Sequence, residues 1–128
     1  GSKNVLELHG SVHRNHCTRC GAFYALDDVL RSAGVPRCGC GGVIKPDVVL
    51  YGEALDAATL TAAARAISRA DLLLVGGTSL NVYPAAGLLR YFSGASLVVI
   101  NKTPTPADAR ADLVIQDAIG HVLDGLEN

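Results

Sequence analysis

The sequence has no methionine and no tryptophan, and only two of its 128 residues are phenylalanine. A hydrophobic core therefore has to be built from leucine, valine, isoleucine and alanine. Hydrophobic residues make up 49% of the chain, which is enough for one domain, or for one domain with a small insert. Charged residues make up only 18%, and this low share argues against a disordered chain.

The chain also lacks runs of basic residues and long apolar runs. Its eleven basic residues are scattered and its formal net charge is −1, so we expect no nucleic acid as partner. No stretch approaches the ~20 apolar residues that span a bilayer, so we expect no membrane as partner. The N-terminal Gly1-Ser2-Lys3 does not begin a signal peptide. We therefore expect a cytoplasmic protein.

Three short apolar runs, at residues 72–75, 97–100 and 113–115, are not broken by polar residues. Such strands are typical of a parallel sheet whose two faces are covered by helices. Helical patterns are expected after the cap residue Asp56, at 85–92 after Pro84 and at 118–126. Shorter extended pieces are expected at 5–8 and 47–50, and a short helix at about 26–33. The pattern predicts an α/β fold with a partial, Rossmann-like parallel sheet.

Small or polar residues follow each of these three apolar runs: Gly76-Gly77-Thr78-Ser79, Asn101-Lys102 and Gln116-Asp117. In an open parallel sheet, ligands bind beyond the carboxyl ends of the strands. Backbone amides near a helix start suit a phosphate, and an asparagine amide can pair with a ribose or a base. The first of these segments is also compatible with a simple tight turn. Three polar strand ends together favour a nucleotide site.

Four cysteines form two close pairs, Cys17/Cys20 and Cys38/Cys40, separated by 17 residues. Two short cysteine turns supply the four thiolates that tetrahedral zinc requires, and a full sphere of four ligands indicates a structural ion. Free thiols, disulfides and an iron–sulfur cluster are the alternatives. The segment is rich in glycine and has little core of its own. We therefore predict a small inserted zinc-binding module at residues 17–46, held by one zinc ion.

Five motifs in order make the whole chain similar to a bacterial-type sirtuin. They are Leu8-His9-Gly10-Ser11, the paired cysteines, Lys45-Pro46-Asp47-Val48-Val49-Leu50-Tyr51-Gly52-Glu53, Gly77-Thr78-Ser79-Leu80-x-Val82-x-Pro84 and Ile100-Asn101. The resemblance implies an NAD-dependent protein-lysine deacylase that releases nicotinamide and O-acyl-ADP-ribose. It also implies that residues 1–16 and 47–128 form an NAD-binding domain around the zinc module.

The resemblance assigns roles residue by residue. His9 matches the catalytic histidine, whose imidazole has a pKa suited to a general base near neutral pH. Read without the family, a histidine before a glycine is more often an ordinary loop residue. The residues that match the segment pairing with an acylated-lysine peptide are Val49, Tyr51, Gly52 and Glu53. The residues that match the NAD site are Gly77, Thr78, Ser79, Asn101, Lys102 and Ala118.

A full sirtuin also has an N-terminal stretch with a Gly-Ala-Gly loop, a flexible cofactor loop and a Gln-Asn-x-Asp motif, and none of these is in this sequence. We therefore expect the chain alone to be inactive or nearly so, and a second chain could supply the N-terminal half. Two other functions stay open. One is a zinc-ribbon or nucleotide-binding interaction module without catalysis, and the other is an ADP-ribosylating relative.

Overall fold

The computed structural model describes residues 2–125, and the chain divides after Thr59 into two compact units. The domain boundaries predicted at 16/17 and 46/47 stay a prediction. Residue 1 and residues 126–128 of the predicted NAD-binding domain lie outside the described residues. No helix within the described part of the chain is long and apolar enough to cross a membrane.

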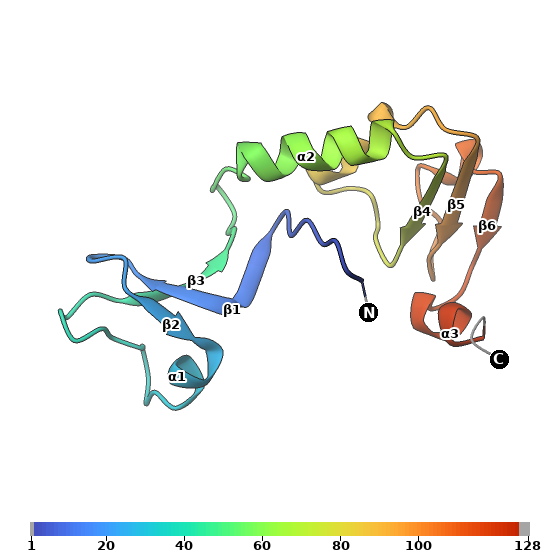
Figure 1. Cartoon of the computed structure of the whole chain (residues 1–128). Helices are drawn as coiled ribbons and strands as arrows, with labels where there is room; N and C mark the ends of the chain where they lie inside the picture. Colours follow the sequence, from blue (N-terminus) through green and yellow to red (C-terminus); the bar gives the residue numbers. More distant parts are fainter. Residues whose placement is uncertain (1, 126–128) are drawn as a thin grey trace. The chain divides into compact units, whose positions relative to one another are not determined.

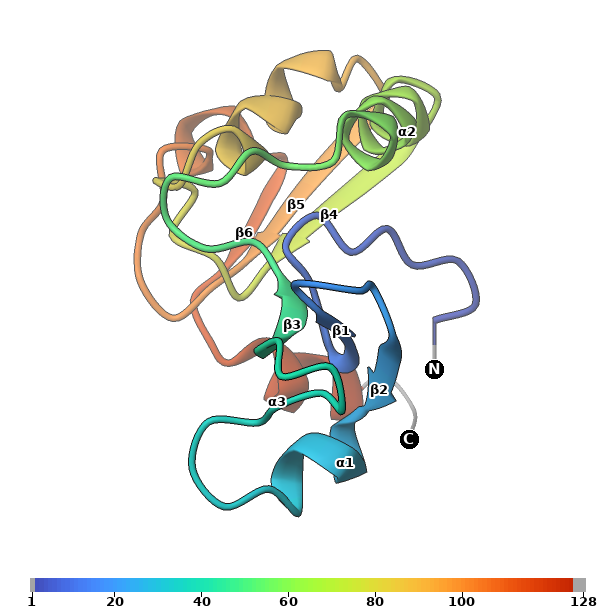
Figure 2. The same ribbon diagram turned by 90° about the vertical axis from the view of Figure 1, so that its left-hand side faces the viewer.

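The first unit is built on a small antiparallel sheet. Its strands are β1 (Gly10–Cys17), β2 (Phe23–Ala25) and β3 (Ile44–Val48), in the order β2-β1-β3. Figure 2 shows these strands together with the short helix α1 (Leu26–Leu30), which follows β2 directly. The predicted helix at 26–33 thus ends three residues early. Ser32 there donates its hydroxyl to the Asp28 carbonyl and its amide to the Val29 carbonyl, and Gly34 has a φ of 74°.

The centre of this sheet contains a buried polar residue at an irregularity. The pairing of β1 with β3 shifts register between Ser11 and Asn15. Asn15 is 1% exposed, and its side-chain amide donates to the carbonyls of Val12 and Tyr24 at 3.0 and 3.3 Å. A buried carbonyl without a partner is costly, so Asn15 stabilises a bulge that the strand could not otherwise accommodate.

The strand predicted at 5–8 is wrong. Residues 5–7 have no regular structure, and Leu8 and His9 lie in a turn that leads into β1. The Gly10 amide donates to the Glu7 carbonyl at 3.0 Å, which closes this turn. Val5 and Leu6 are 63% and 46% exposed, so no neighbouring strand among the described residues covers them. Without such a partner, apolar side chains alone do not make a strand.

The second unit contains the parallel sheet that the apolar runs predict. Its strands β4 (Leu72–Gly76), β5 (Ser96–Ile100) and β6 (Leu113–Ile115) lie side by side in that order (Figure 1), so the predicted parallel sheet is confirmed. Helix α2 (Ala57–Ser68) begins after Asp56, whose carboxylate accepts from the Thr59 amide at 2.7 Å. The predicted cap is therefore present.

Two other predicted helices differ in type or length. The pattern at 85–92 forms a 3₁₀-helix, η1 (Ala85–Tyr91), with Pro84 at the N-cap and not at the first helical position. Glycine lowers helix propensity, and the Gly87 amide donates three residues back, to the Pro84 carbonyl. A second 3₁₀ turn is η2 (Asp108–Arg110), and the last helix is α3 (Ile119–Asp124) with Ala118 at its N-cap.

The central strand β5 is the only one of the three with fully buried residues: Leu97, Val99 and Ile100 are at most 3% exposed. In contrast, Leu72 and Leu74 of β4 are 57% and 42% exposed. The expectation that helices cover both faces of every strand is therefore wrong for β4 within the described residues. β4 is also an edge strand of this sheet.

Candidate functional site

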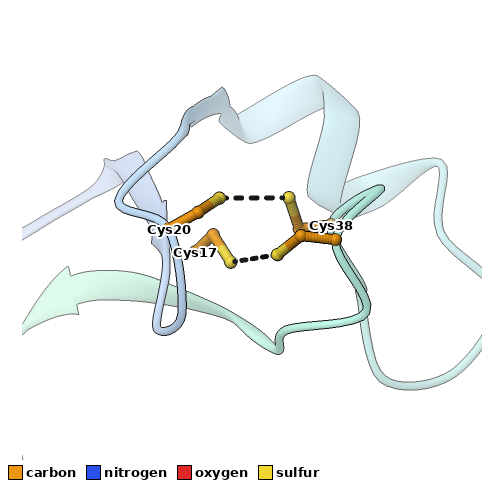
Figure 3. Close-up of side chains that lie close together, drawn as sticks. Cys17, Cys20 and Cys38 are labelled. Carbon is orange, nitrogen blue, oxygen red and sulfur yellow. Dashed lines mark hydrogen bonds between the residues drawn. The ribbon is translucent and has the colours of Figure 1, made fainter.

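The four cysteines meet at one point in the first unit. The two close pairs of sulfur atoms are Cys17 with Cys40 at 3.5 Å and Cys20 with Cys38 at 3.6 Å. All four sulfur atoms lie within 4.8 Å of one another, and none is in a disulfide. Figure 3 shows the side chains of Cys17, Cys20 and Cys38 pointing toward this point. Zinc–sulfur bonds of ~2.3 Å in a tetrahedron would separate the sulfur atoms by about 3.8 Å, so the arrangement fits zinc.

The surroundings lower the pKa of two of these thiols and raise the pKa of a third. The Cys40 amide donates to the Cys38 sulfur and lowers the pKa of that thiol to about 6. Amides of Cys20 and Arg19 lower the pKa of Cys17. The Gly42 amide also acts to lower the pKa of Cys40, but the surrounding thiols outweigh it and raise that pKa to about 12. A divalent cation at the centre stabilises the negative charge of all four thiolates, and it therefore also favours deprotonation of Cys40.

The predicted zinc cluster is therefore assembled by the fold, from the ends of β1 and the turn before β3. Four thiolates fill a tetrahedral sphere and leave no position for water or substrate, so zinc here holds the module together and takes no part in catalysis. The Arg19 side chain braces the second cysteine turn, since it donates to the Cys40 carbonyl at 2.7 Å. His13 and His16 are not part of the cluster.

The fold brings His9 next to the predicted peptide-binding segment. Gly10 pairs with Val48 in the sheet, and the Val49 amide donates to the His9 carbonyl at 3.1 Å. His9 itself is exposed, at the turn before β1. Tyr51 is fully exposed, and Gly52 has a φ of 85°, a left-handed conformation that glycine adopts without strain.

Glu53 braces this segment from within. Its carboxylate accepts from the Leu50 amide at 2.9 Å and from the Lys45 ammonium at 3.1 Å, while its own amide donates to the Leu50 carbonyl. The Leu50 amide, and after it Lys45, lower the pKa of Glu53 below its ordinary value. The carboxylate is therefore charged and occupied by contacts with its own loop and with strand β3.

In the second unit, residues from the carboxyl ends of the strands line one cavity of about 300 Å³. The sequence predictions Gly77, Asn101, Lys102 and Ala118 all line it, together with Asp117, Ile119 and Gly120. Gly77 has a φ of 62°, and a Cβ on the neighbouring Gly76 would collide with the Ile119 side chain. The two glycines thus let the strand end lie against the start of α3.

Thr78 and Ser79 do not line this cavity; they are exposed in the loop that follows β4. The Thr78 hydroxyl accepts from the Leu80 amide at 3.2 Å. The Asn101 side-chain amide donates to the Thr103 carbonyl at 2.8 Å, which fixes the turn after β5. The predicted contacts of Thr78, Ser79 and Asn101 with NAD therefore stay predictions.

Asp117 was identified in the sequence only as part of a polar strand end. In the structure its carboxylate accepts from the Ala118 amide at 2.6 Å and pairs with the His121 ring at 2.7 Å. The Ala118 amide, and after it His121, lower the pKa of Asp117. Asp117 thus carries a charge at the cavity wall and anchors the start of α3. Its position directly after an apolar strand, ahead of a helix, was the available signal.

Comparison with known proteins identifies the family of the chain. The sequence pattern described as the Sir2 family matches residues 1–84. An NAD-dependent protein deacetylase of Clostridium perfringens is 61% identical over 125 residues, which are 96% of this chain and 51% of that protein. One of Clostridium acetobutylicum is 58% identical over 126 residues, 97% of this chain and 51% of the relative. The chain thus spans about half the length of the curated relatives it matches.

Solved structures extend the similarity to three dimensions. A structure described as Sir2Tm bound to a propionylated peptide has a TM-score of 0.90 and 39% identity, covering 98% of this chain and 56% of that one. A structure described as Sir2 with a p53 peptide and NAD+ has a TM-score of 0.89 and 39% identity, covering 98% of this chain and 55% of that one. The family pattern covers residues 1–84, and the relatives and solved structures cover nearly the whole chain, which therefore belongs to the Sir2 family.

Proposed function

We propose that this chain is part of an NAD-dependent protein-lysine deacylase. The observation that carries the proposal is the cavity at the carboxyl ends of β4, β5 and β6, which collects Gly77, Asn101, Lys102 and Ala118 from three strand ends. This is where an open parallel sheet binds nucleotides. The curated relatives are named NAD-dependent protein deacetylases, and the same activity is our proposal for the complete protein.

His9 acts as the general base in this proposal. NAD supplies, when bound, the ribose carbon that takes the acyl oxygen and the nicotinamide that leaves. With NAD bound, the His9 imidazole would accept a proton from a ribose hydroxyl and so make that oxygen a better nucleophile. A neutral imidazole suits this task near neutral pH. The link between His9 and Val49 supports the role, because it ties the base to the segment that we expect to carry the substrate.

The acylated peptide would add to the segment after β3. Val49 follows β3 directly, Tyr51 and Gly52 lie in the exposed turn after it, and backbone pairing accepts varied peptide sequences. Glu53 is proposed to act indirectly, by holding the loop in shape. In the cofactor site, Thr78, Ser79, Asn101 and Lys102 are proposed to contact phosphate and ribose, and Ala118 to contact adenine through its backbone.

The complete site is proposed to need more than this chain. The exposed apolar residues of β4 lie on an edge strand, where another strand can pair and cover them. We propose that the N-terminal half of the protein, on the same or a second chain, occupies this place. A cytoplasmic location is part of the proposal, since a reducing compartment keeps the four cysteines available to zinc.

The test uses the assembled protein, meaning this chain joined to the upstream half of the Clostridium perfringens relative. It is incubated with NAD and an acetyl-lysine peptide, and the products are identified by mass spectrometry. Nicotinamide, O-acetyl-ADP-ribose and free lysine peptide in equal amounts are expected. A peptide that gains ADP-ribose would instead support the ADP-ribosylating relative. Bound NAD without any product would support a nucleotide-binding module.

A further inference from the structure

A second cavity in the parallel-sheet unit lies outside the proposed NAD site. It has a volume of about 290 Å³ and lies between η1 and η2, and it shares no lining residue with the cavity at the strand ends. Its apolar lining includes Leu80, Ala86, Leu89 and Ala107, and its cationic lining is Arg90 and Arg110. Cavities that bind small ligands have this composition, mostly apolar with a few polar groups, and volumes from ~300 Å³ upward.

The two guanidinium groups have no acidic partner. Within residues 2–125, neither Arg90 nor Arg110 forms an ion pair. Arg90 donates to the Tyr91 hydroxyl at 2.8 Å and lies over that ring at 4.9 Å. The nearby Asp108 is occupied, since its carboxylate accepts from the hydroxyl and the amide of Thr105. Arg90 and Arg110 both line the cavity, so an anion bound there would be attracted by two positive charges.

The walls of the cavity are held in place by the local backbone. Leu80 has a φ of 55°, a left-handed conformation that a branched side chain rarely adopts and that costs roughly 1–2 kcal/mol. Such strain persists where the surroundings fix it, and it is common at ligand sites. The ring of Tyr83 lies close to Gly87, where an added Cβ would be only 3.4 Å from it. On the opposite side, Ala107 is 1% exposed.

We infer that this cavity binds a small organic acid, with its carboxylate between Arg90 and Arg110 and its apolar body against Leu80, Ala86 and Ala107. Guanidinium groups match a carboxylate because they can donate two parallel hydrogen bonds. The apolar lining decides against an inorganic anion, which would leave this surface without a contact. The site is independent of the proposed NAD chemistry and does not require it.

The test is a titration of the assembled protein, zinc-loaded and labelled with ¹⁵N, with benzoate, and in parallel with neutral benzamide and with inorganic phosphate. Benzoate should cause saturable shifts of the amides of Gly87 and Ala107. Benzamide and phosphate should each bind at least tenfold more weakly, because one lacks the charge and the other the apolar body. Equal binding of benzamide or of phosphate, or no saturable shift with benzoate, would overturn the inference.

Variants of the two cavity arginines test whether benzoate binds in this cavity. Arg90→Gln and Arg110→Gln should each weaken benzoate binding, and Arg69→Gln is the matched control, an exposed arginine just after α2 that does not line the cavity. An unchanged affinity for benzoate in both cavity variants, with amide spectra otherwise superimposable on those of the parent, would also overturn the inference. The comparison of benzoate with benzamide uses the unaltered assembled protein and stands even if a variant fails to fold.

Discussion

The carboxylate of Glu53 joins its own loop, at the Leu50 amide, to strand β3, at the Lys45 ammonium. The family resemblance places Glu53 among the peptide-binding residues, but its contacts are those of a brace. A residue of this kind acts on the substrate by fixing the backbone beside it. Sequence spacing could not reveal this, because Lys45 is eight residues away and only the turn at Gly52 brings the two side chains together.

In the assembled protein, Glu53→Ala should raise KM for the acetylated peptide about tenfold and leave KM for NAD unchanged, because the unmade hydrogen bonds loosen the loop. Lys45→Met should raise the peptide KM in the same direction, since it removes the partner and leaves Glu53 intact. Steady-state kinetics provide the check, with Asp27→Ala on α1 as control. An effect of Glu53→Ala without any effect of Lys45→Met would instead indicate direct contact with the peptide.

At the scale of elements, the zinc-binding module depends on a close approach of its two cysteine turns. A Cβ at Gly42 would lie 2.6 Å from the Cys17 sulfur and 2.8 Å from the Arg19 Cβ, whereas one at Gly39 would meet nothing within 4 Å. The cysteine spacing predicts which residues bind the metal. The spacing does not predict which glycine the folded zinc-binding module requires, because this requirement depends on how the two cysteine turns pack.

Gly42→Ala should therefore weaken zinc binding by about 10–100-fold, the range typical of changes just outside a metal's ligands, while Gly39→Ala should leave it unchanged. Competition with a chromogenic chelator measures both affinities. Equal retention of zinc by the two variants would show that the second turn can move aside, contrary to the packing described here.

Helix α2 begins at a cap that the sequence identifies correctly. The Thr59 hydroxyl, and after it the Thr59 amide, lower the pKa of Asp56 below its ordinary value of 3.8. The folded pKa is depressed, so this contribution to stability is fully present above pH 3.8 and is lost as the pH falls through the lowered value.

Thr59→Val should raise the pKa of Asp56 toward 3.8, while Thr59→Ser, which keeps the hydroxyl, should leave it depressed. A carbonyl-detected NMR titration of the Asp56 side chain measures this directly. The same pKa in Thr59→Val as in the parent chain would show that the hydroxyl contributes nothing to the cap.

Other elements were harder to predict, for identifiable physical reasons. The apolar runs predict the parallel strands because their pattern is local. The segment at 5–8 has a strand-like sequence but no neighbour among the described residues, and the helix predicted at 85–92 is 3₁₀ over its whole length, Ala85–Tyr91. Strand β1 was missed because it is short of apolar residues and is stabilised by Asn15, whose role appears only when Tyr24 lies beside it.

For the whole molecule, the two units supply different parts of one proposed reaction. The first unit holds His9 beside the segment at Val49, and the second holds the cavity at the strand ends. The sequence predicted Gly77, Asn101, Lys102 and Ala118 in that cavity, because strand ends of a parallel sheet meet at one edge. It did not single out Asp117, whose role depends on contacts with Ala118 and His121.

The most direct test of the account is the rate of NAD-dependent deacetylation in three forms of the assembled protein: unaltered, His9→Ala and His13→Ala. His13 is exposed on β1 and serves as the matched control. We predict that His9→Ala lowers kcat about 10²–10⁴-fold with NAD still bound, and that His13→Ala retains the parent rate. A His9→Ala form that deacetylates as fast as the parent would contradict the role of His9 and, with it, the proposed site.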